Sequence, residues 1–149
     1  MIEARKAFQA LPEELRTAIW EATEETADRM AYGAKARLRH GHGVRTGALR
    51  DAIGVTKSKR SGIARVGLRR GPVVVTLPSG RRVRHRPSAI GHLVEFGSKN
   101  RTQDKTGRRT GSMRPRPFML PAAEEQRAPY VQRLNRQGKV FERAMSRYL

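Results

Sequence analysis

Histidines and carboxylates are the side chains with which this sequence of 149 residues could bind a metal or perform acid–base catalysis. His40 and His42 are two residues apart, but no third ligand lies near them, and the glycines around them favour a flexible linker. His92 and Glu95 have the spacing of one helix face, yet a metal site of the helix-bundle type needs a second such pair, which the sequence lacks. We therefore predict no metal, no cofactor and a structural role for these residues.

Catalytic motifs are missing from the sequence as well. Paired-carboxylate catalysis needs two acids in one cleft, and residues 40–120 contain only Asp51, Glu95 and Asp104. The remaining acids lie among lysines and arginines on predicted helices, as on a solvated helix face. The sequence also lacks cysteine, the G-x-S-x-G and S-x-x-K nucleophile motifs and the G-x-x-x-x-G-K-S/T phosphate loop. We predict that the protein is not an enzyme and has no catalytic residues.

Basic side chains are the most distinctive component of the sequence. The chain has 32 Lys and Arg against 13 Asp and Glu, which gives a formal net charge of +19. Residues 1–39 are neutral overall and residues 121–149 carry +3, whereas residues 40–120 carry +16. A charge of this size indicates polyanions or acidic protein surfaces as partners.

The basic centre predicts contact with a nucleic-acid backbone without reading of its sequence. Its arginines and lysines suit salt-dependent binding to phosphates. Single-strand binders add stacking aromatic side chains, and this region has only Phe96 and Phe118. No recognition helix, zinc finger or aromatic RNP strand is visible. A solvated face, or pairing with an acidic neighbour in an assembly, explains the same charges equally well.

Two long helices are predicted at the ends of the chain. The first segment breaks at Leu11-Pro12 and continues as an amphipathic helix of about seven turns that ends near Arg39. Its predicted apolar face consists of Leu15, Ile19, Ala22, Thr26, Met30 and Gly33. Residues 122–149 repeat the helical spacing, with kinks expected at Pro129 and Gly138.

Shorter elements are predicted between these helices. Thr46 is expected to cap a helix of one or two turns, and residues 88–97 form another short helix that ends at its glycine. The β-compatible runs 55–57 and 63–68 form one strand pair. A second pair is formed by residues 73–77 and 81–86 around the turn Pro78-Ser79-Gly80.

Residues 97–116 combine seven basic residues with only Met113 and Pro115 as apolar ones. Such a segment buries too little to offset its ordering entropy, so we predict a mobile basic loop. The predicted fold is α+β: a long N-terminal helix, a small antiparallel sheet with a projecting basic hairpin, and a C-terminal helix packed on the sheet. Residues 1–149 are expected to form a single domain.

Eleven basic residues in the hairpin and the loop are predicted to face DNA or a partner. They are Arg69, Arg70, Arg81, Arg82, Arg84, Arg86, Lys99, Arg101, Lys105, Arg108 and Arg109.

Three motifs, read in order, resemble a known family. They are Thr46 to Ile53, His92 to Ser98 and Arg116 to Ala122, preceded by the stretch Ala34 to Arg37. The order is similar to that of the neck and tail-completion family of long-tailed bacteriophages, prophages and phage-like gene-transfer particles. That family includes head-to-tail joining proteins and minor tail components. The sequence departs from the family pattern at Ala52 and Ser98, where serine and threonine are common, and in a more basic hairpin.

The resemblance implies that the motif residues have structural roles. The residues concerned are Thr46, Gly47, Leu49, Glu95, Phe96, Gly97, Pro117, Phe118 and Pro121. Thr46 and Gly47 would turn the chain into a short helix, and Phe96 would be an aromatic anchor before a change of direction. Phe118 would pack as an anchor at the start of the last helix.

The resemblance further implies a structural virion protein that joins or completes the tail as a ring, expected to be a hexamer. Its partners would be other copies of itself, adjacent head-to-tail connector, tail-terminator or tail-tube proteins, and genomic DNA in the channel. It would be made in the bacterial host cytoplasm and reside in the neck or tail of the virion. The N-terminal residues lack a long uncharged apolar run, so neither a signal peptide nor a membrane partner is expected. The alternative is a free non-specific nucleic-acid-binding protein.

Overall fold

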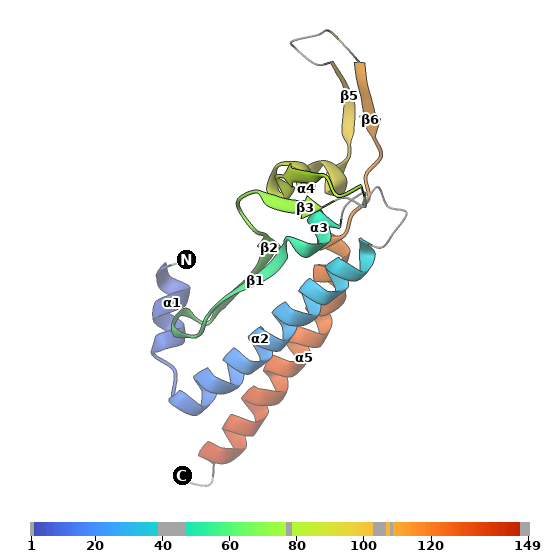
Figure 1. Ribbon diagram of the computed structural model, residues 1–149. Helices are drawn as coiled ribbons and strands as arrows, with labels where there is room; N and C mark the ends of the chain where they lie inside the picture. Colours follow the sequence, from blue (N-terminus) through green and yellow to red (C-terminus); the bar gives the residue numbers. More distant parts are fainter. Residues whose placement is uncertain (1, 39–46, 77–78, 103–106, 108, 147–149) are drawn as a thin grey trace. The chain divides into compact units, whose positions relative to one another are not determined.

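The computed structural model describes residues 2–38, 47–76, 79–102, 107 and 109–146 (Figure 1). Helices and strands are mixed along the chain, which confirms the α+β class. Their order is α1 (Ile2–Gln9), α2 (Glu13–Arg37), α3 (Ala48–Asp51), β1 (Ile53–Ser58), the 3-10 turn η1 (Lys59–Ser61), β2 (Ile63–Leu68), β3 (Val73–Thr76), β4 (Arg82–His85), α4 (Pro87–Phe96), β5 (Ser98–Thr102), β6 (Arg109–Met113) and α5 (Met119–Met145).

The strands form three separate pairs, β1–β2, β3–β4 and β5–β6, where the sequence predicted one sheet with a projecting hairpin. Each strand pairs with its neighbour along the chain. Both predicted strand pairs are present, and the third, β5–β6, was not predicted.

Contacts group the chain into two compact units. The first unit comprises residues 1–30, 55–66 and 123–149, and the second comprises residues 31–54 and 67–122. The expectation of a single domain stays a prediction.

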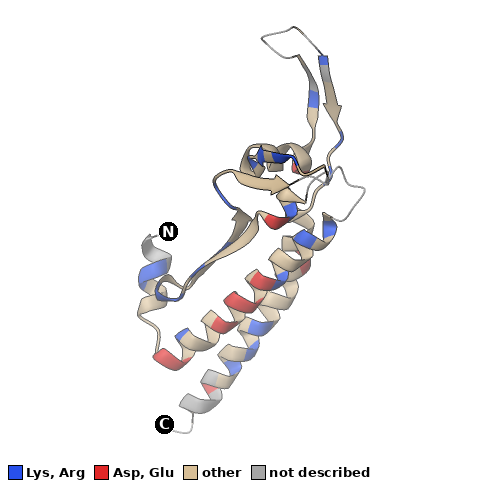
Figure 2. Cartoon of the chain, in the orientation of Figure 1, with Lys and Arg blue, Asp and Glu red and all other residues tan. Residues whose placement is uncertain are grey.

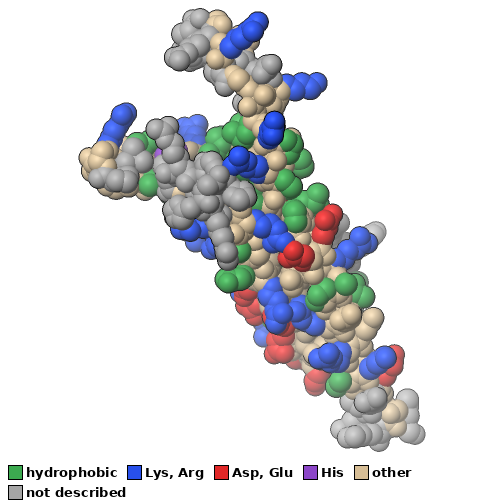
Figure 3. All heavy atoms as spheres, turned by 90° about the vertical axis from the view of Figure 1, so that its right-hand side faces the viewer, with side chains coloured by type: hydrophobic (Ala, Val, Ile, Leu, Met, Phe, Trp, Pro, Cys, Tyr) green, Lys and Arg blue, Asp and Glu red, His purple; other side chains and the backbone are tan. Residues whose placement is uncertain are grey.

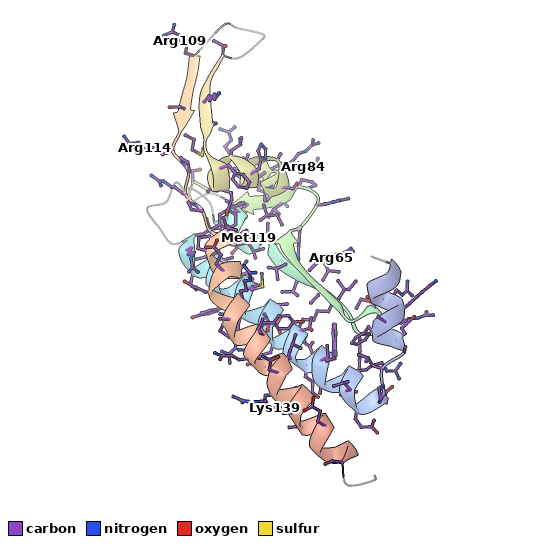
Figure 4. The ribbon with its side chains drawn as sticks, turned by 180° about the vertical axis from the view of Figure 1, so that it is seen from behind. Arg65, Arg84, Arg109, Arg114, Met119 and Lys139 are labelled. Atoms are coloured by element: carbon purple, nitrogen blue, oxygen red, sulfur yellow. The ribbon has the colours of Figure 1, made fainter. Side chains whose placement is uncertain are left out.

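In the first unit, α5 packs along α2. Polar side chains of the two helices contact each other, and a small set of buried side chains lies on α2. The Thr23 hydroxyl lies 3.1 Å from the Tyr130 hydroxyl, and Arg133 Nη1 donates to Thr26 Oγ1 at 2.9 Å. Trp20, Ala22, Thr26 and Ala27 are buried on α2, and two of them, Ala22 and Thr26, belong to the predicted apolar face. The two helices run side by side in Figures 1 and 4.

The β1–β2 pair is attached to the same unit by side chains at its turn. Gly62 ends η1 with φ +63°, and a Cβ added there would lie 2.8 Å from ring atoms of Phe8. The position therefore requires glycine both for its backbone conformation and for space. Lys57 on β1 donates to Glu24 Oε1 at 3.0 Å and to Asp28 Oδ2 at 2.8 Å on α2.

In the second unit, small residues allow helices to approach closely. A Cβ on Gly33 would lie 3.5 Å from the Cβ of Ala122, and one on Gly91 would collide with Leu68. The buried residues of this unit are Ala31, Ala34, Leu38, Ala48, Leu49, Ala52, Ile53, Pro87, Gly91, Glu95, Phe118 and Ala122. Among the side chains that are less than 2% exposed, Phe118, Leu38, Ile53 and Pro87 are the largest. The core of the second unit therefore forms around the C-terminal part of α2, α3 and the start of α5.

The two short helices are both present, with one change at a cap. Helix α3 is preceded by Gly47 at the N-cap position with φ +68° and without a side-chain cap hydrogen bond. The predicted cap, Thr46, lies outside the described residues. Helix α4 begins with Pro87 and ends at Gly97, whose φ is +75°, as the sequence predicted.

The segment predicted as an irregular loop contains a strand pair instead. Strands β5 and β6 are antiparallel, with Ser98 opposite Met113 and Thr102 opposite Arg109, and with register shifts in between. Backbone pairing satisfies the polar main chain here although the side chains bury little, and composition alone does not reveal such pairing. The predicted mobility of the segment stays a prediction.

Candidate functional site

The positive charge of the chain is concentrated in the second unit. This unit contains 18 Lys and Arg against three Asp and Glu, a net charge of +15, while the first unit contains 14 against ten, a net charge of +4. Figure 2 shows most of the acidic positions among the described residues along α2. The second unit also contains all eleven predicted contact residues, so it holds the candidate site.

Several charged residues of the first unit are paired with one another. Arg29 lies 2.6 Å from Glu25, and Glu25 also lies 3.3 Å from Arg133. Arg16 pairs with Glu13 one helical turn away. Lys57 lies between Glu24 and Asp28, and these two carboxylates raise the pKa of Lys57 above its ordinary value of 10.5. These contacts are structural: they join α2 to β1 and to α5.

The β3–β4 pair presents arginines on one face. Its register places Val74 opposite Arg84 and Thr76 opposite Arg82, and all four side chains are exposed. The other face, with Val73, Val75, Val83 and His85, is half-buried. Because side chains alternate along a strand, Arg82 and Arg84 point to the same side (Figure 4 labels Arg84). We call the β3–β4 strand pair, together with the flanking Arg81 and Arg86, the arginine ribbon.

No carboxylate neutralises the arginine ribbon within the part of the chain that the structure describes. Asp51 lies 3.4 Å from Arg50, Glu95 is buried, and Asp104 lies outside the described residues. The following residues are exposed and make no ion pair with any described residue: Arg69, Arg70, Arg81, Arg82, Arg84, Arg86, Lys99 and Arg109.

The remaining predicted contact residues belong to the β5–β6 hairpin. Lys99 on β5 and Arg109 on β6 are exposed. Arg101 is a backbone partner of Gly111 in this pair. Lys105 and Arg108 lie outside the described residues.

Glu95 is the acidic residue of this unit with a defined structural task. Its Oε2 accepts hydrogen bonds from the backbone N–H groups of Phe118 at 2.9 Å and Met119 at 3.0 Å, and its Oε1 accepts one from Leu120 at 2.9 Å. These donors are the first N–H groups of α5, which have no partner inside the helix. Sequence reasoning placed Glu95 in a motif without foreseeing this contact. An acid in an otherwise apolar helix segment was the available signal.

Phe96, expected to be an aromatic anchor before a change of direction, is 73% exposed, so its ring is not part of the core of the subunit. The helix turns Glu95 inward, and its neighbour Phe96 therefore points outward. Phe118, by contrast, is only 1% exposed.

Two further apolar side chains are exposed on residues whose backbone groups lie near Glu95 or Gly97, the neighbours of Phe96. Met113 is 44% exposed and Leu120 is 54% exposed. Leu120 N–H binds the carboxylate next to Phe96, and a Cβ on Gly97 would lie 2.7 Å from the Met113 carbonyl oxygen. We call Phe96, Met113 and Leu120 the junction patch, because α4, β6 and α5 meet there. Figure 3 shows exposed hydrophobic side chains beside basic ones on one face.

Comparison with protein families gives one match. The description of the family whose profile matches residues 2–97 reads "Bacteriophage HK97-gp10, putative tail-component". The chain belongs to this family. Searches of curated proteins and of solved structures gave no significant match.

Membership of the HK97-gp10 family confirms the resemblance to phage tail proteins. A tail component is a part of the virion and contacts other tail or neck proteins. The matched range contains α1 to α4 and includes Glu95 and the arginine ribbon. Strands β5 and β6 and helix α5, with the third motif, lie beyond it.

The described residues can also be compared with the requirements of a metal site and of a membrane-spanning helix. Among the described residues, no three His, Asp or Glu side chains gather as metal ligands would. None of the described helices combines the length and the apolar character that crossing a membrane requires.

Proposed function

We propose that this HK97-gp10 family protein is a structural protein of the head-to-tail junction or the tail end, which completes or joins the tail as a closed ring around the DNA channel. The match of residues 2–97 to a tail-component family carries the proposal. The second unit supports it by presenting two exposed surfaces of different chemistry, the junction patch and the arginine ribbon.

The junction patch suits a protein neighbour. Aromatic and Met side chains are enriched in protein–protein interfaces, and their burial supplies most of the favourable free energy. Phe96 leaves most of its ring exposed in the isolated subunit, at a position fixed by the buried Glu95 beside it. We propose that this patch contacts an adjacent subunit or a neighbouring tail protein.

A ring follows when such contacts are heterologous and the rotation between subunits closes. Six copies are the proposed number. The neighbours would be head-to-tail connector, tail-terminator or tail-tube proteins, with genomic DNA passing through the ring. In this arrangement the arginines of the second unit face the DNA or an acidic neighbouring ring.

Electron cryomicroscopy of purified particles tests this position. We expect density for the protein at the neck or the tail end, and we expect particles from a deletion mutant to have unjoined heads and tails or irregular tail ends. Particles that lack the protein at both places, or a deletion mutant that yields normal particles, would contradict the proposal.

A second candidate function is that of a free non-specific nucleic-acid-binding protein. The exposed arginines without ion pairs favour it. It predicts abundant protein outside particles and binding to arbitrary duplexes that weakens steeply with salt. Purified protein that binds no duplex at low ionic strength would eliminate it.

A further inference from the structure

We propose that the arginine ribbon binds the phosphate backbone of duplex DNA, so that Arg82 and Arg84 contact phosphates and not an acidic protein. This inference deepens the proposed function and rests on it, because it names the partner of one surface of the ring protein. Four observations carry it: the placement of the arginines, their lack of partners, the charge of an assembly, and the composition of the exposed face.

The placement suits a line of phosphates. Residues two apart on a strand lie about 7 Å apart on the same face, so β4 presents Arg82 and Arg84 as a short row. Opposite them on β3 are only the neutral side chains of Val74 and Thr76. Each guanidinium presents a planar fork of donors that matches phosphate oxygens. The row is held on backbone pairing from Val73–His85 to Thr76–Arg82, which keeps its geometry before any partner binds.

The arginines of the ribbon are poised for an external anion. Arg81, Arg82, Arg84 and Arg86 are exposed and form no ion pair with any described residue. In the first unit, by contrast, Arg29, Lys57 and Arg133 pair with carboxylates of the same unit. Like charges held close together repel each other, and a polyanion that binds the ribbon relieves this repulsion.

Copies of the same chain do not supply the missing negative charge. Each copy has a formal net charge of +19, so every subunit added to a ring increases the excess of positive charge. The acids of α2 that lie near basic groups, such as Glu25 and Asp28, are already paired within their own unit. The excess positive charge of the ring as a whole must therefore be balanced from outside it.

The composition of the exposed face favours DNA over an acidic protein. Stable protein interfaces have an apolar centre from which charged residues are depleted. On the exposed face of the ribbon Val74 is the only apolar side chain among the described residues, and the more strongly exposed Tyr32 and Phe96 of this unit lie on other elements. The described residues of β3 to β4 include no Phe, Tyr or Trp ring on which a single-stranded base would stack. Duplex phosphates, contacted irrespective of sequence, are the partner that remains.

Fluorescence anisotropy with two 30-base-pair duplexes of unrelated sequence tests the inference. The variant is R82Q/R84Q in the full chain. The matched control is R127Q/K139Q on α5, which removes the same charge from exposed residues of the first unit that form no ion pair with described residues (Figure 4 labels Lys139). Each phosphate contact contributes about 0.9 to the slope of log K against log salt concentration.

We expect the wild type to bind both duplexes equally and R82Q/R84Q to lower the slope by about 1.8. The ratio of wild-type to variant affinity should fall about tenfold between 50 and 200 mM salt. The control should keep the wild-type slope. Equal losses in both variants, no loss in R82Q/R84Q, or no duplex binding by the wild type would each overturn the inference.

Particles carrying the same variants separate this inference from the proposed function. If R82Q/R84Q is incorporated at the neck or tail end but duplex binding is unaffected, the inference is wrong and the proposed function stands. If R82Q/R84Q fails to assemble while its duplex binding is normal, the ribbon binds an acidic protein and the inference is again wrong. If the wild type binds duplexes through the ribbon but is absent from neck and tail, the proposed function fails instead.

Discussion

The carboxylate of Glu95 lies 2.9 Å from the backbone nitrogen of Phe118, so the end of α4 caps the beginning of α5. Two motifs that are 23 residues apart in the sequence thereby become one contact. Glu95 is only 8% exposed, and its two carboxylate oxygens accept from three successive N–H groups. Charge-assisted bonds of this kind at a helix N-terminus are stronger than neutral ones.

Removal of this cap should destabilise the protein. We expect Glu95→Ala to lower the free energy of unfolding by about 3 kcal/mol, because buried N–H groups lose their acceptor. Urea denaturation followed by circular dichroism measures the change. Glu124→Gln, at an exposed position on α5, is the control and should stay within about 0.5 kcal/mol of the wild type. Equal stability of Glu95→Ala and Glu124→Gln would show that the cap contributes nothing.

Phe118 and Phe96 should respond in opposite ways to the same truncation. Phe118→Ala removes a buried ring and should cost about 3–5 kcal/mol of stability. Phe96→Ala removes an exposed ring and should leave the melting temperature within a few degrees, while particle assembly fails because the junction patch is lost. An unchanged melting temperature for Phe118→Ala, or normal particle yield for Phe96→Ala, would count against these roles.

Gly62 and Gly138 form a second matched pair. Gly62→Ala places a Cβ 2.8 Å from the Phe8 ring at a backbone φ of +63°, and should destabilise by about 1–3 kcal/mol. Gly138→Ala meets open space in the middle of α5 and should stabilise by about 0.5–1 kcal/mol. Thermal denaturation of both variants measures these changes in stability. If both substitutions lowered the melting temperature, or both raised it, the prediction would be wrong.

Lys57 should make the stability of the fold depend on pH in the alkaline range. Its pKa is raised in the folded state by Asp28 and Glu24, so its contribution to stability is fully present below pH 10.5, the ordinary value, and is lost as the pH rises through the raised pKa. The stability difference between wild type and Lys57→Gln should therefore be constant at neutral pH and shrink above pH 10.5. Melting temperatures measured from pH 7 to pH 11.5 test this, and a difference that grows with pH would refute it.

Reversal of charge along the arginine ribbon should separate folding from assembly. We expect R81E/R82E/R84E/R86E to fold, because all four side chains are exposed and unpaired with described residues, but to block assembly of particles. Circular dichroism of the purified variant and a particle count in a complementation assay are the two measurements. Normal particle yield from this variant would contradict a role for the ribbon in the virion.

Periodicity and turn chemistry were sufficient to predict the helices and two strand pairs. The break at Pro12, the end of α4 at Gly97 and the strands around Ser79 and Gly80 follow from residues with strong local preferences. The β5–β6 pair was missed because its pairing is a backbone property, and its side chains give no apolar alternation. Composition argued for a loop, and long-range backbone pairing overrode it.

The candidate surface was partly visible in the sequence. The exposed arginines of residues 81–86 could be located from charge and spacing alone. The exchange of roles between Glu95 and Phe96 could not, because it depends on which side of α4 meets the start of α5. A buried acid beside an exposed aromatic ring is the reverse of the usual distribution of polar and apolar residues. Glu95 is buried because its carboxylate accepts hydrogen bonds from three backbone N–H groups of α5 and the residue before it.

Hydrogen bonds join the two ends of the β5–β6 hairpin, so the segment between them can be exchanged without changing the rest of the subunit. Ser98 Oγ accepts from Met113 N–H at 3.1 Å, the Val94 carbonyl accepts from Arg116 N–H at 2.7 Å, and Glu95 holds the chain where α5 begins. The chain thus leaves α4 and returns to α5 through fixed points, independent of what lies between them. Relatives can therefore differ in the length and sequence of this arm without remodelling the core, and a foreign peptide grafted into it would be displayed on an otherwise native subunit.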